Sequence, residues 1–315
     1  NGNKISEIED KNYENQKISN DKYNLKLILY LLSTISNDHH RYPNFFDKIN
    51  LLLSYLKNDI QNHLSNWEIF EIFEISKPIL LILLRDKILI NDEQISDYLS
   101  IFPFFKDNPI DDNNYTEKHR IGENDDFLCE IIRKDLIEEF ISFLKKNDHP
   151  IDCRIKSSIY ETNSFLIKNT DTTLIEYSAF YGSMQIFKYL ISNEVELTPR
   201  LWLYAIHGQN VELIQILEEK EVEPYEDSLK ESIKCHHNNF FGYIQDNYFK
   251  NDSENLSDIS IYDLKYYNFG FMEWKYIEKL FFYLCKYDYY FLVDILFKNI
   301  NIDINKKQIQ IPIFI

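Results

Sequence analysis

The chain has 315 residues, a formal net charge of −17 and a hydrophobic content of 44%. Its 6 Gly and 8 Pro residues are too few for a collagen-like or low-complexity chain, so we expect a globular protein. Because a strongly acidic surface repels phosphate groups, the charge argues against binding to nucleic acid or to anionic membranes. The simplest interpretation of the charge is solubility, and a preference for a basic partner is the sharper alternative.

The cysteines and the apolar runs bear on the cellular compartment. Cys129, Cys153, Cys235 and Cys285 are widely spaced and form no Cys-x-x-Cys pair. This pattern is typical of reduced structural thiols and predicts a cytoplasmic protein. The first residues form a polar segment without the apolar core of a signal peptide. The longest apolar run, 79–84, is far too short to cross a bilayer, so no membrane segment is expected.

Taken in chain order, the sequence predicts seven regions. Residues 1–21 form a polar N-terminal segment, residues 22–125 an N-terminal helical region with degenerate repeats, and residues 126–171 a helix pair with a connector. Residues 172–249 hold the clearest repeats, residues 250–272 an insertion, and residues 273–305 one further repeat. Residues 306–315 are apolar, whereas a terminal repeat should present a polar face, so they are interpreted as the start of a truncated next repeat.

The clearest repeat rests on two small residues that recur together. Ala179 and Gly182 reappear as Ala205 and Gly208 at the same interval (205 − 179 = 26 and 208 − 182 = 26). The alanines suit a close approach of two helices. We expect both glycines to adopt the left-handed backbone conformation that turns one helix into the next. A fixed period of helix pairs predicts an all-α solenoid of stacked antiparallel pairs.

Weaker copies agree in phase with these two. They place Ser76, Asp135, His236 and Asp288 at the turn between two helices. After the two clear copies, apolar segments at 184–191 and 211–217 predict the second helix of each pair. The agreement in phase predicts a stack with very little strand.

The repeats resemble the ankyrin repeat, whose helix pair carries the pattern Thr-Pro-Leu-His-x-Ala-Ala-x-x-Gly. Thr173, Ile175, Ala179 and Gly182 match it in the first copy, and Leu201, Ala205 and Gly208 match it in the second. The segments 174–182, 201–208 and 229–237 are also similar to a large, lineage-expanded ankyrin family of a parasitic protist, whose members are uncharacterised. The resemblance implies an ankyrin-like solenoid with a role in protein interaction, and it implies no particular partner and no catalytic residue.

One departure from the ankyrin pattern concerns the inter-repeat finger. Ankyrin repeats have a period of about 33 residues, which includes a β-hairpin finger. Between Leu190 and Thr198 there is hardly room for this hairpin. We therefore expect shortened inter-repeat fingers, with residues 301–305 as the best finger-like segment.

No pattern in the sequence predicts catalysis, a metal ion or a cofactor. Cys235, His236 and His237 are adjacent, and neighbours on a helix point in different directions, whereas zinc needs convergent ligands. Glycine-rich phosphate loops and Gly-x-Ser-x-Gly are absent from the sequence. Adjacent carboxylates such as those at 125–126 would need an enclosed site to act as acid and base. We therefore expect a protein that is not an enzyme.

Surface positions of the inner helices remain as candidates for partner binding. The ankyrin resemblance implies that residues near the turn glycine line the concave face of the stack. The tentative partner-binding residues are Tyr177, Tyr181, Leu203, His207, Gln209 and Glu231. Tyrosine is enriched at binding hot spots, but 23 Tyr and 23 Phe residues in one chain also favour a packing role.

The leading hypothesis for function is a non-catalytic protein–protein interaction scaffold with an unknown, basic protein partner. One alternative is an interaction module of a larger protein whose enzymatic domain lies outside this chain. Another is a non-functional fragment of an expanded gene family.

Overall fold

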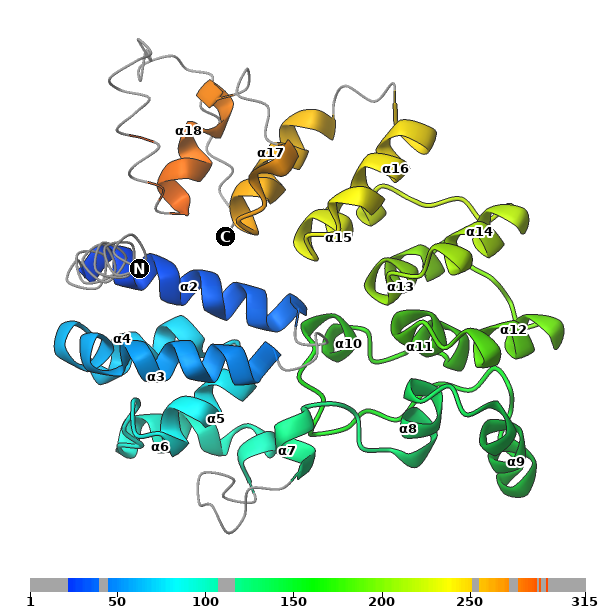
Figure 1. Cartoon of the computed structure of the whole chain (residues 1–315), viewed down its shortest axis with the longest axis horizontal. Helices are drawn as coiled ribbons and strands as arrows, with labels where there is room; N and C mark the ends of the chain where they lie inside the picture. The colour runs from blue at the N-terminus through cyan, green and yellow to red at the C-terminus, as the bar shows by residue number, and fades with distance from the viewer. Residues whose placement is uncertain are drawn as a thin grey trace, which may run out of the picture. The chain divides into compact units, whose positions relative to one another are not determined.

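The structure is a computed structural model that describes residues 22–39, 45–106, 117–250, 255–271, 277–287, 289 and 293. These residues form α-helices and two short 3-10 helices, and no strand is found among them beyond one antiparallel bridge between Arg154 and Thr173. The expectation of an all-α protein is confirmed. The chain divides into two compact units, residues 1–134 with 138–174 and residues 135–137 with 175–315 (Figure 1).

The first unit is a group of helices, and residues 25–105 of it share one apolar core. Its helices are α2 (Lys22–His39), α3 (Phe45–His63), α4 (Asn66–Phe73), α5 (Lys77–Arg85), α6 (Glu93–Ser100), η1 (Pro103–Phe105), α7 (Glu117–Ile121), α8 (Phe127–Arg133), most of α9 (Ile137–Asn147) and α10 (Ser164–Lys168). Helix α2 packs against α3 and α4, and α5 packs against the same two helices. Leu29, Leu53, Phe70 and Leu83 are fully buried in this core.

The second unit repeats one helix pair. Its helices are α11 (Leu174–Tyr181), α12 (Met184–Ser192), α13 (Leu201–Gly208), α14 (Val211–Glu219), α15 (Asp227–Lys234), α16 (Asn238–Tyr248), α17 (Asn255–Lys265), η2 (Phe269–Phe271) and α18 (Ile277–Lys286). Figure 1 shows α11–α12, α13–α14 and α15–α16 as successive pairs. The second helices start where the apolar segments predicted them, at residues 184 and 211.

Left-handed backbone conformations mark the true period of these pairs. Gly182, Gln209 and His236 have φ values of 67°, 51° and 56° at the turn inside each pair, and they are equally spaced (209 − 182 = 27 and 236 − 209 = 27). Glu194 and Glu221, just after the second helices, have φ values of 61° and 57° and share this spacing (221 − 194 = 27). The interval that the sequence analysis took as the period (208 − 182 = 26) is therefore wrong by one position.

Gly208 is not the turn residue that the sequence predicted. The left-handed residue is Gln209, whereas Gly208 is the last residue of α13. A close contact between helices explains the glycine at position 208. A Cβ atom on it would lie 2.3 Å from the carbonyl oxygen of Ala179 in α11. The glycine lets two helix backbones approach closely.

The residue that repeats with Ala205 is serine. Ser178 lies one period before Ala205 and Ser232 one period after it (205 − 178 = 27 and 232 − 205 = 27), and all three are fully buried. A small side chain at this position thus recurs in all three inner helices. Ala179, with which the sequence analysis aligned Ala205, corresponds instead to Ile206 (206 − 179 = 27).

Among the weaker copies, the three described turn residues lie between two helices, as predicted. Asp135 and His236 adopt left-handed conformations, with φ values of 52° and 56°. Ser76, between α4 and α5, does not: its φ is −107°, and its hydroxyl lies 2.7 Å from that of Ser36 in the core. Asp288 and the segments 301–305 and 306–315 lie outside the described residues.

In the predicted insertion, 250–272, α17 forms and packs against α15.

None of the described helices is both long enough and apolar enough to span a bilayer.

Candidate functional site

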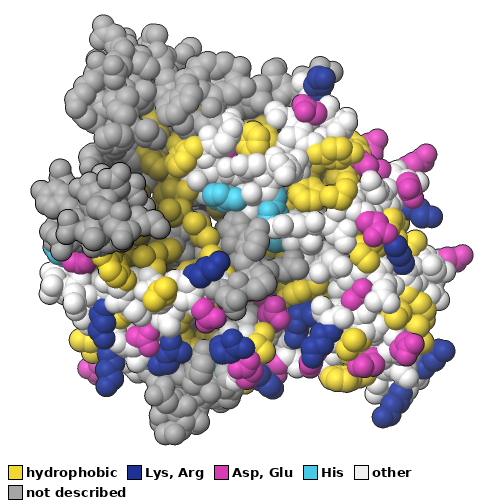
Figure 2. Space-filling view, viewed as in Figure 1, with side chains coloured by type: hydrophobic (Ala, Val, Ile, Leu, Met, Phe, Trp, Pro, Cys, Tyr) yellow, Lys and Arg dark blue, Asp and Glu magenta, His cyan; other side chains and the backbone are white. Residues whose placement is uncertain are grey.

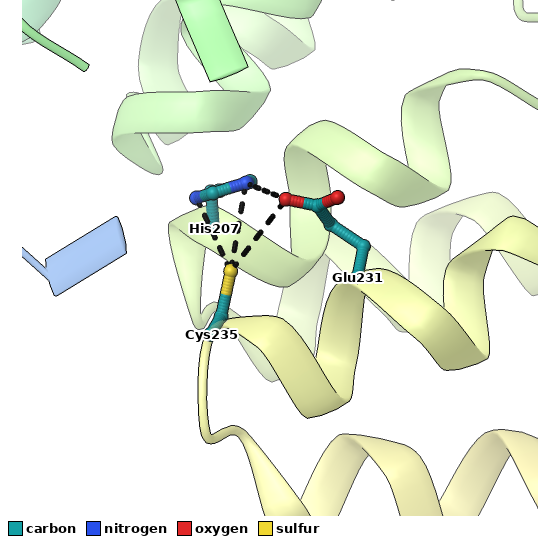
Figure 3. Close-up of side chains that lie close together, drawn as sticks. All are labelled: His207, Glu231 and Cys235. Atoms are coloured by element: carbon teal, nitrogen blue, oxygen red, sulfur yellow. Dashed lines mark hydrogen bonds and ion pairs between the residues drawn. The ribbon is translucent and has the colours of Figure 1, made fainter. Parts of the chain in front are cut away.

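Three side chains from neighbouring inner helices meet in the second unit. Figure 3 shows His207 at the end of α13 facing Glu231 and Cys235 of the α15 segment. The His207 Nε2 atom lies 2.8 Å from Glu231 Oε1, and the Cys235 Sγ atom lies 3.8 Å from the same oxygen. Sγ is also 3.6 Å from both ring nitrogens of His207. We call these three residues the polar cluster.

Helix geometry explains why these residues converge. Glu231 and Cys235 are four residues apart, so they lie on the same face of α15. Cys235 is the C-cap residue of that helix, and its backbone N–H donates to the Glu231 carbonyl. His207 is in the last turn of α13, which packs directly against α15. Stacking the two pairs therefore brings a histidine from one repeat to a carboxylate and a thiol from the next.

The carboxylate of the polar cluster is held in its charged form. Burial raises the pKa of Glu231, but the hydrogen bond with His207 and the charge of Lys234 outweigh it, and the pKa falls to about 2. The Lys234 ammonium lies 3.0 Å from Glu231 Oε1, the same oxygen that His207 contacts. One carboxylate oxygen is therefore shared by two basic side chains.

The imidazole ring is fixed between two neighbours. The ring of Phe180 in α11 stacks on His207, with centroids 4.8 Å apart and an angle of 28° between the planes. Because Cys235 Sγ is equally far from both ring nitrogens, it faces the ring and not the lone pair of one nitrogen. Cys235 is fully buried and His207 is 5% exposed. The site is closed to a substrate, so the thiol is not placed as a nucleophile.

The polar cluster has donors suitable for zinc but not the geometry of a zinc site. Tetrahedral Zn²⁺ with bonds of about 2.3 Å to sulfur and about 2.0 Å to nitrogen and oxygen separates S from N by about 3.6 Å and N from O by about 3.4 Å. The observed S–N distance of 3.6 Å fits, but the N–O distance is that of a hydrogen bond, 2.8 Å. The Lys234 ammonium also forms an ion pair with the same Glu231 oxygen. As it stands, this is a hydrogen-bonded contact between repeats.

Several of the residues that the sequence predicted for partner binding are buried or partly buried in the structure. Tyr177 is fully buried, so its expected place on an accessible surface is wrong. It is equivalent to Tyr204, also fully buried (204 − 177 = 27), because this position of the inner helix faces the core. His207 is buried and Glu231 partly buried, and the two meet in the polar cluster.

The other three predicted residues keep some access to solvent. Tyr181 and Leu203 are partly buried, and the ring of Tyr181 lies 4.8 Å from that of Tyr177. Gln209 is exposed, and its side-chain nitrogen lies 2.9 Å from His237 Nε2. The structure therefore does not assemble the six residues into one open patch.

The sequence analysis did not predict that Cys235 meets His207 and Glu231. The signal was available in the spacing. The interval between His207 and Cys235 (235 − 207 = 28) exceeds the true period by one position, so they fall at adjacent positions of neighbouring inner helices.

Part of the second unit matches a known domain family. Fold and site define an all-helical protein whose second unit repeats a helix pair and joins two of the pairs through a buried polar cluster. Residues 193–274 match a domain of unknown function, DUF3447, and this range includes all three residues of the cluster. No curated protein and no solved structure matches the chain.

Proposed function

We propose that this chain is a non-catalytic protein-interaction scaffold, and that its second unit is an ankyrin-like solenoid with shortened fingers. The observation that carries the proposal is the equal spacing of the left-handed turns Gly182, Gln209 and His236. Equivalent residues of successive pairs then form rows, and rows of side chains on stacked helices make an extended binding surface. The free thiols, of which Cys129 and Cys235 are buried, support a reducing, cytoplasmic setting.

The accessible residues of the inner helices indicate which side of them forms the proposed binding face. Leu203 and Lys230 are equivalent (230 − 203 = 27), and both are partly exposed. Gln209 is exposed at the turn after α13. We place the partner along this row, on the side of α13 and α15 that carries Leu203 and Lys230. Tyr177 takes no part, since it is in the core.

Charge suggests the chemistry of the partner. The segment from the end of α14 to the start of α15 carries Glu218, Glu219, Glu221, Glu223, Glu226 and Asp227 against a single Lys220. Figure 2 shows several acidic side chains along the right-hand edge of the view, in the region of α14. A partner with a basic rim fits this surface, and such complementarity acts mainly on association rate and salt dependence. The net charge of −17 disfavours nucleic acid and anionic membranes as partners.

The test is quantitative affinity capture with the full chain as bait, followed by titration of any captured protein. The test variant is the double substitution Leu203→Ala and Gln209→Ala, and the control is Asn239→Ala, an exposed residue of the outer helix α16. The proposal expects a saturable partner that is lost with the double variant and retained with the control. A partner that binds both variants equally, or no saturable partner, contradicts it.

A further inference from the structure

The first unit contains a cavity of about 320 Å³ that is separate from the polar cluster. It is formed by the start of α5, by η1, by the connector 155–161 and by the segment from α10 to Thr170. Its size falls in the lower range of small-molecule sites, which is about 300–1,000 Å³. The residues that decide its chemistry are Lys77, Phe104, Glu161, Leu166, Ile167 and Thr170.

The cavity wall carries one basic group, the ammonium of Lys77. Lys77 is the first residue of α5, and its Nζ atom lies 5.9 Å from the centre of the Phe104 ring. Burial lowers the pKa of Lys77, and the charge of Glu161 partly offsets the effect. Among the residues that the structure describes, none forms an ion pair with this ammonium. A half-buried cation without an ion pair is a site for an anionic group.

Glu161 does not serve as the partner of Lys77, because its carboxylate is already used. Its Oε1 atom accepts hydrogen bonds from the backbone N–H groups of Thr162, at 3.0 Å, and Asn163, at 2.8 Å. Its Oε2 atom accepts one from the backbone N–H of Asn124, at 3.2 Å. These bonds tie the connector to the segment before α8 and fix the carboxylate in the wall. Burial nevertheless raises the pKa of Glu161 to about 7, so near neutral pH the carboxyl is only partly charged.

The rest of the wall is mainly apolar. Phe104 and Leu166 are buried, and Ile167, which also lines the cavity, is exposed. The hydroxyl-bearing residue Thr170 is a further exposed lining residue. A fully hydrated ion such as phosphate leaves these apolar side chains unfilled. An apolar molecule without charge leaves the ammonium unpaired. The cavity therefore suits an amphiphilic ligand, which has one anionic group and an apolar body.

We propose that this cavity binds a small monocarboxylate, with its carboxylate on the Lys77 ammonium and its apolar body against Phe104, Leu166 and Ile167. A volume of about 320 Å³ lies at the lower end of the range for small-molecule sites. The matching ligand is a small aliphatic or aromatic acid. This site is independent of the proposed protein-binding face, which lies in the other unit.

The test is titration of the full chain with hexanoate, with 1-hexanol as the uncharged analogue and with inorganic phosphate as the anion without an apolar body. Binding is followed by calorimetry and by amide chemical shifts of Ile167 and Thr170. We expect hexanoate to bind at least tenfold more tightly than hexanol and phosphate not to saturate. Equal binding of hexanoate and hexanol overturns the role assigned to Lys77. Saturation by phosphate as tight as by hexanoate overturns the role of the apolar wall, and no saturation by hexanoate overturns the site.

Variants of the lysine sharpen this comparison. Lys77→Met should weaken hexanoate at least tenfold without changing hexanol, and Lys77→Arg should retain most of the hexanoate affinity. Lys48→Met, at an exposed lysine of α3, is the matched control and should change neither. Unchanged hexanoate binding by Lys77→Met contradicts the proposal. If that variant fails to fold, the wild-type comparison of hexanoate, hexanol and phosphate still decides the proposal.

Discussion

Replacing Gly208 with alanine should destabilise the second unit, because the added methyl group meets backbone. The new Cβ atom would lie 2.3 Å from the Ala179 carbonyl oxygen and 3.5 Å from the Gly182 nitrogen. These are backbone atoms of the preceding pair, so relief requires a shift of α11 relative to α13. Overpacking of this kind costs about 1–3 kcal/mol, and a clash with backbone belongs near the upper end. Alanine recovers roughly 0.5–1 kcal/mol relative to glycine in a helix. We expect a net loss of about 2 kcal/mol.

Gly242 provides the matched control. It lies in α16 of the same unit, and a Cβ atom there meets nothing within 4 Å. Gly242→Ala should therefore stabilise the unit by roughly 0.5–1 kcal/mol. Urea unfolding measures both variants, and hydrogen exchange of α13 amides reports the effect locally if unfolding is not two-state. A Gly208→Ala variant as stable as Gly242→Ala would refute the close approach of α11 and α13.

Four further outcomes follow from the geometry. Gln209→Gly should be neutral or slightly stabilising in urea unfolding, because Gln209 has a φ of 51° that glycine adopts without strain, whereas glycine inside a helix costs about 1 kcal/mol. Ala205→Leu should lower stability by about 1–3 kcal/mol through overpacking of a fully buried position, and an unchanged melting temperature contradicts this. Glu231→Gln should cost about 3 kcal/mol, since it removes the charge partner of Lys234 and weakens the hydrogen bond with His207, and Glu212→Gln, at an exposed residue of α14, is its control. Burial raises the pKa of Glu161 from 4.5 to about 7, so the folded state holds a proton that the unfolded state loses, and stability falls as the pH rises from about 4.5 to 7. The shift corresponds to about 3 kcal/mol, and Glu161→Gln should flatten this dependence in urea midpoints measured from pH 5 to 8.

Sequence patterns predicted the helical class and much of the element placement, because both depend on local periodicity. The apolar segments 184–191 and 211–217 correspond to α12, Met184–Ser192, and α14, Val211–Glu219. Side chains that repeat every three or four residues identify the buried stripe of a helix whatever it packs against. Asp135 was likewise predicted as a turn, and it adopts a left-handed conformation.

The cavity in the first unit could not be predicted in this way. Lys77 and Glu161 are far apart in the sequence and belong to no repeat. Their placement depends on the connector 155–161, whose shape is set by side-chain hydrogen bonds such as that from Asn124 to the Lys156 carbonyl, at 2.6 Å. Such bonds leave no periodic trace in the sequence.

The one-residue error in the period shows why fold and site were not equally predictable. An error of one residue in the assumed period does not change where the helices are predicted, so the predicted fold class stays the same. On a helix of about 3.6 residues per turn, however, one residue corresponds to about 100° of rotation. Aligning Gly182 with Gly208 in place of Gln209 therefore changed which residues were taken to share a face. It paired the fully buried Tyr177 with the partly exposed Leu203 in place of the fully buried Tyr204. The left-handed turn residue fixes the register more reliably than the glycine does, because glycine also serves where two backbones come close, as Gly208 does against Ala179.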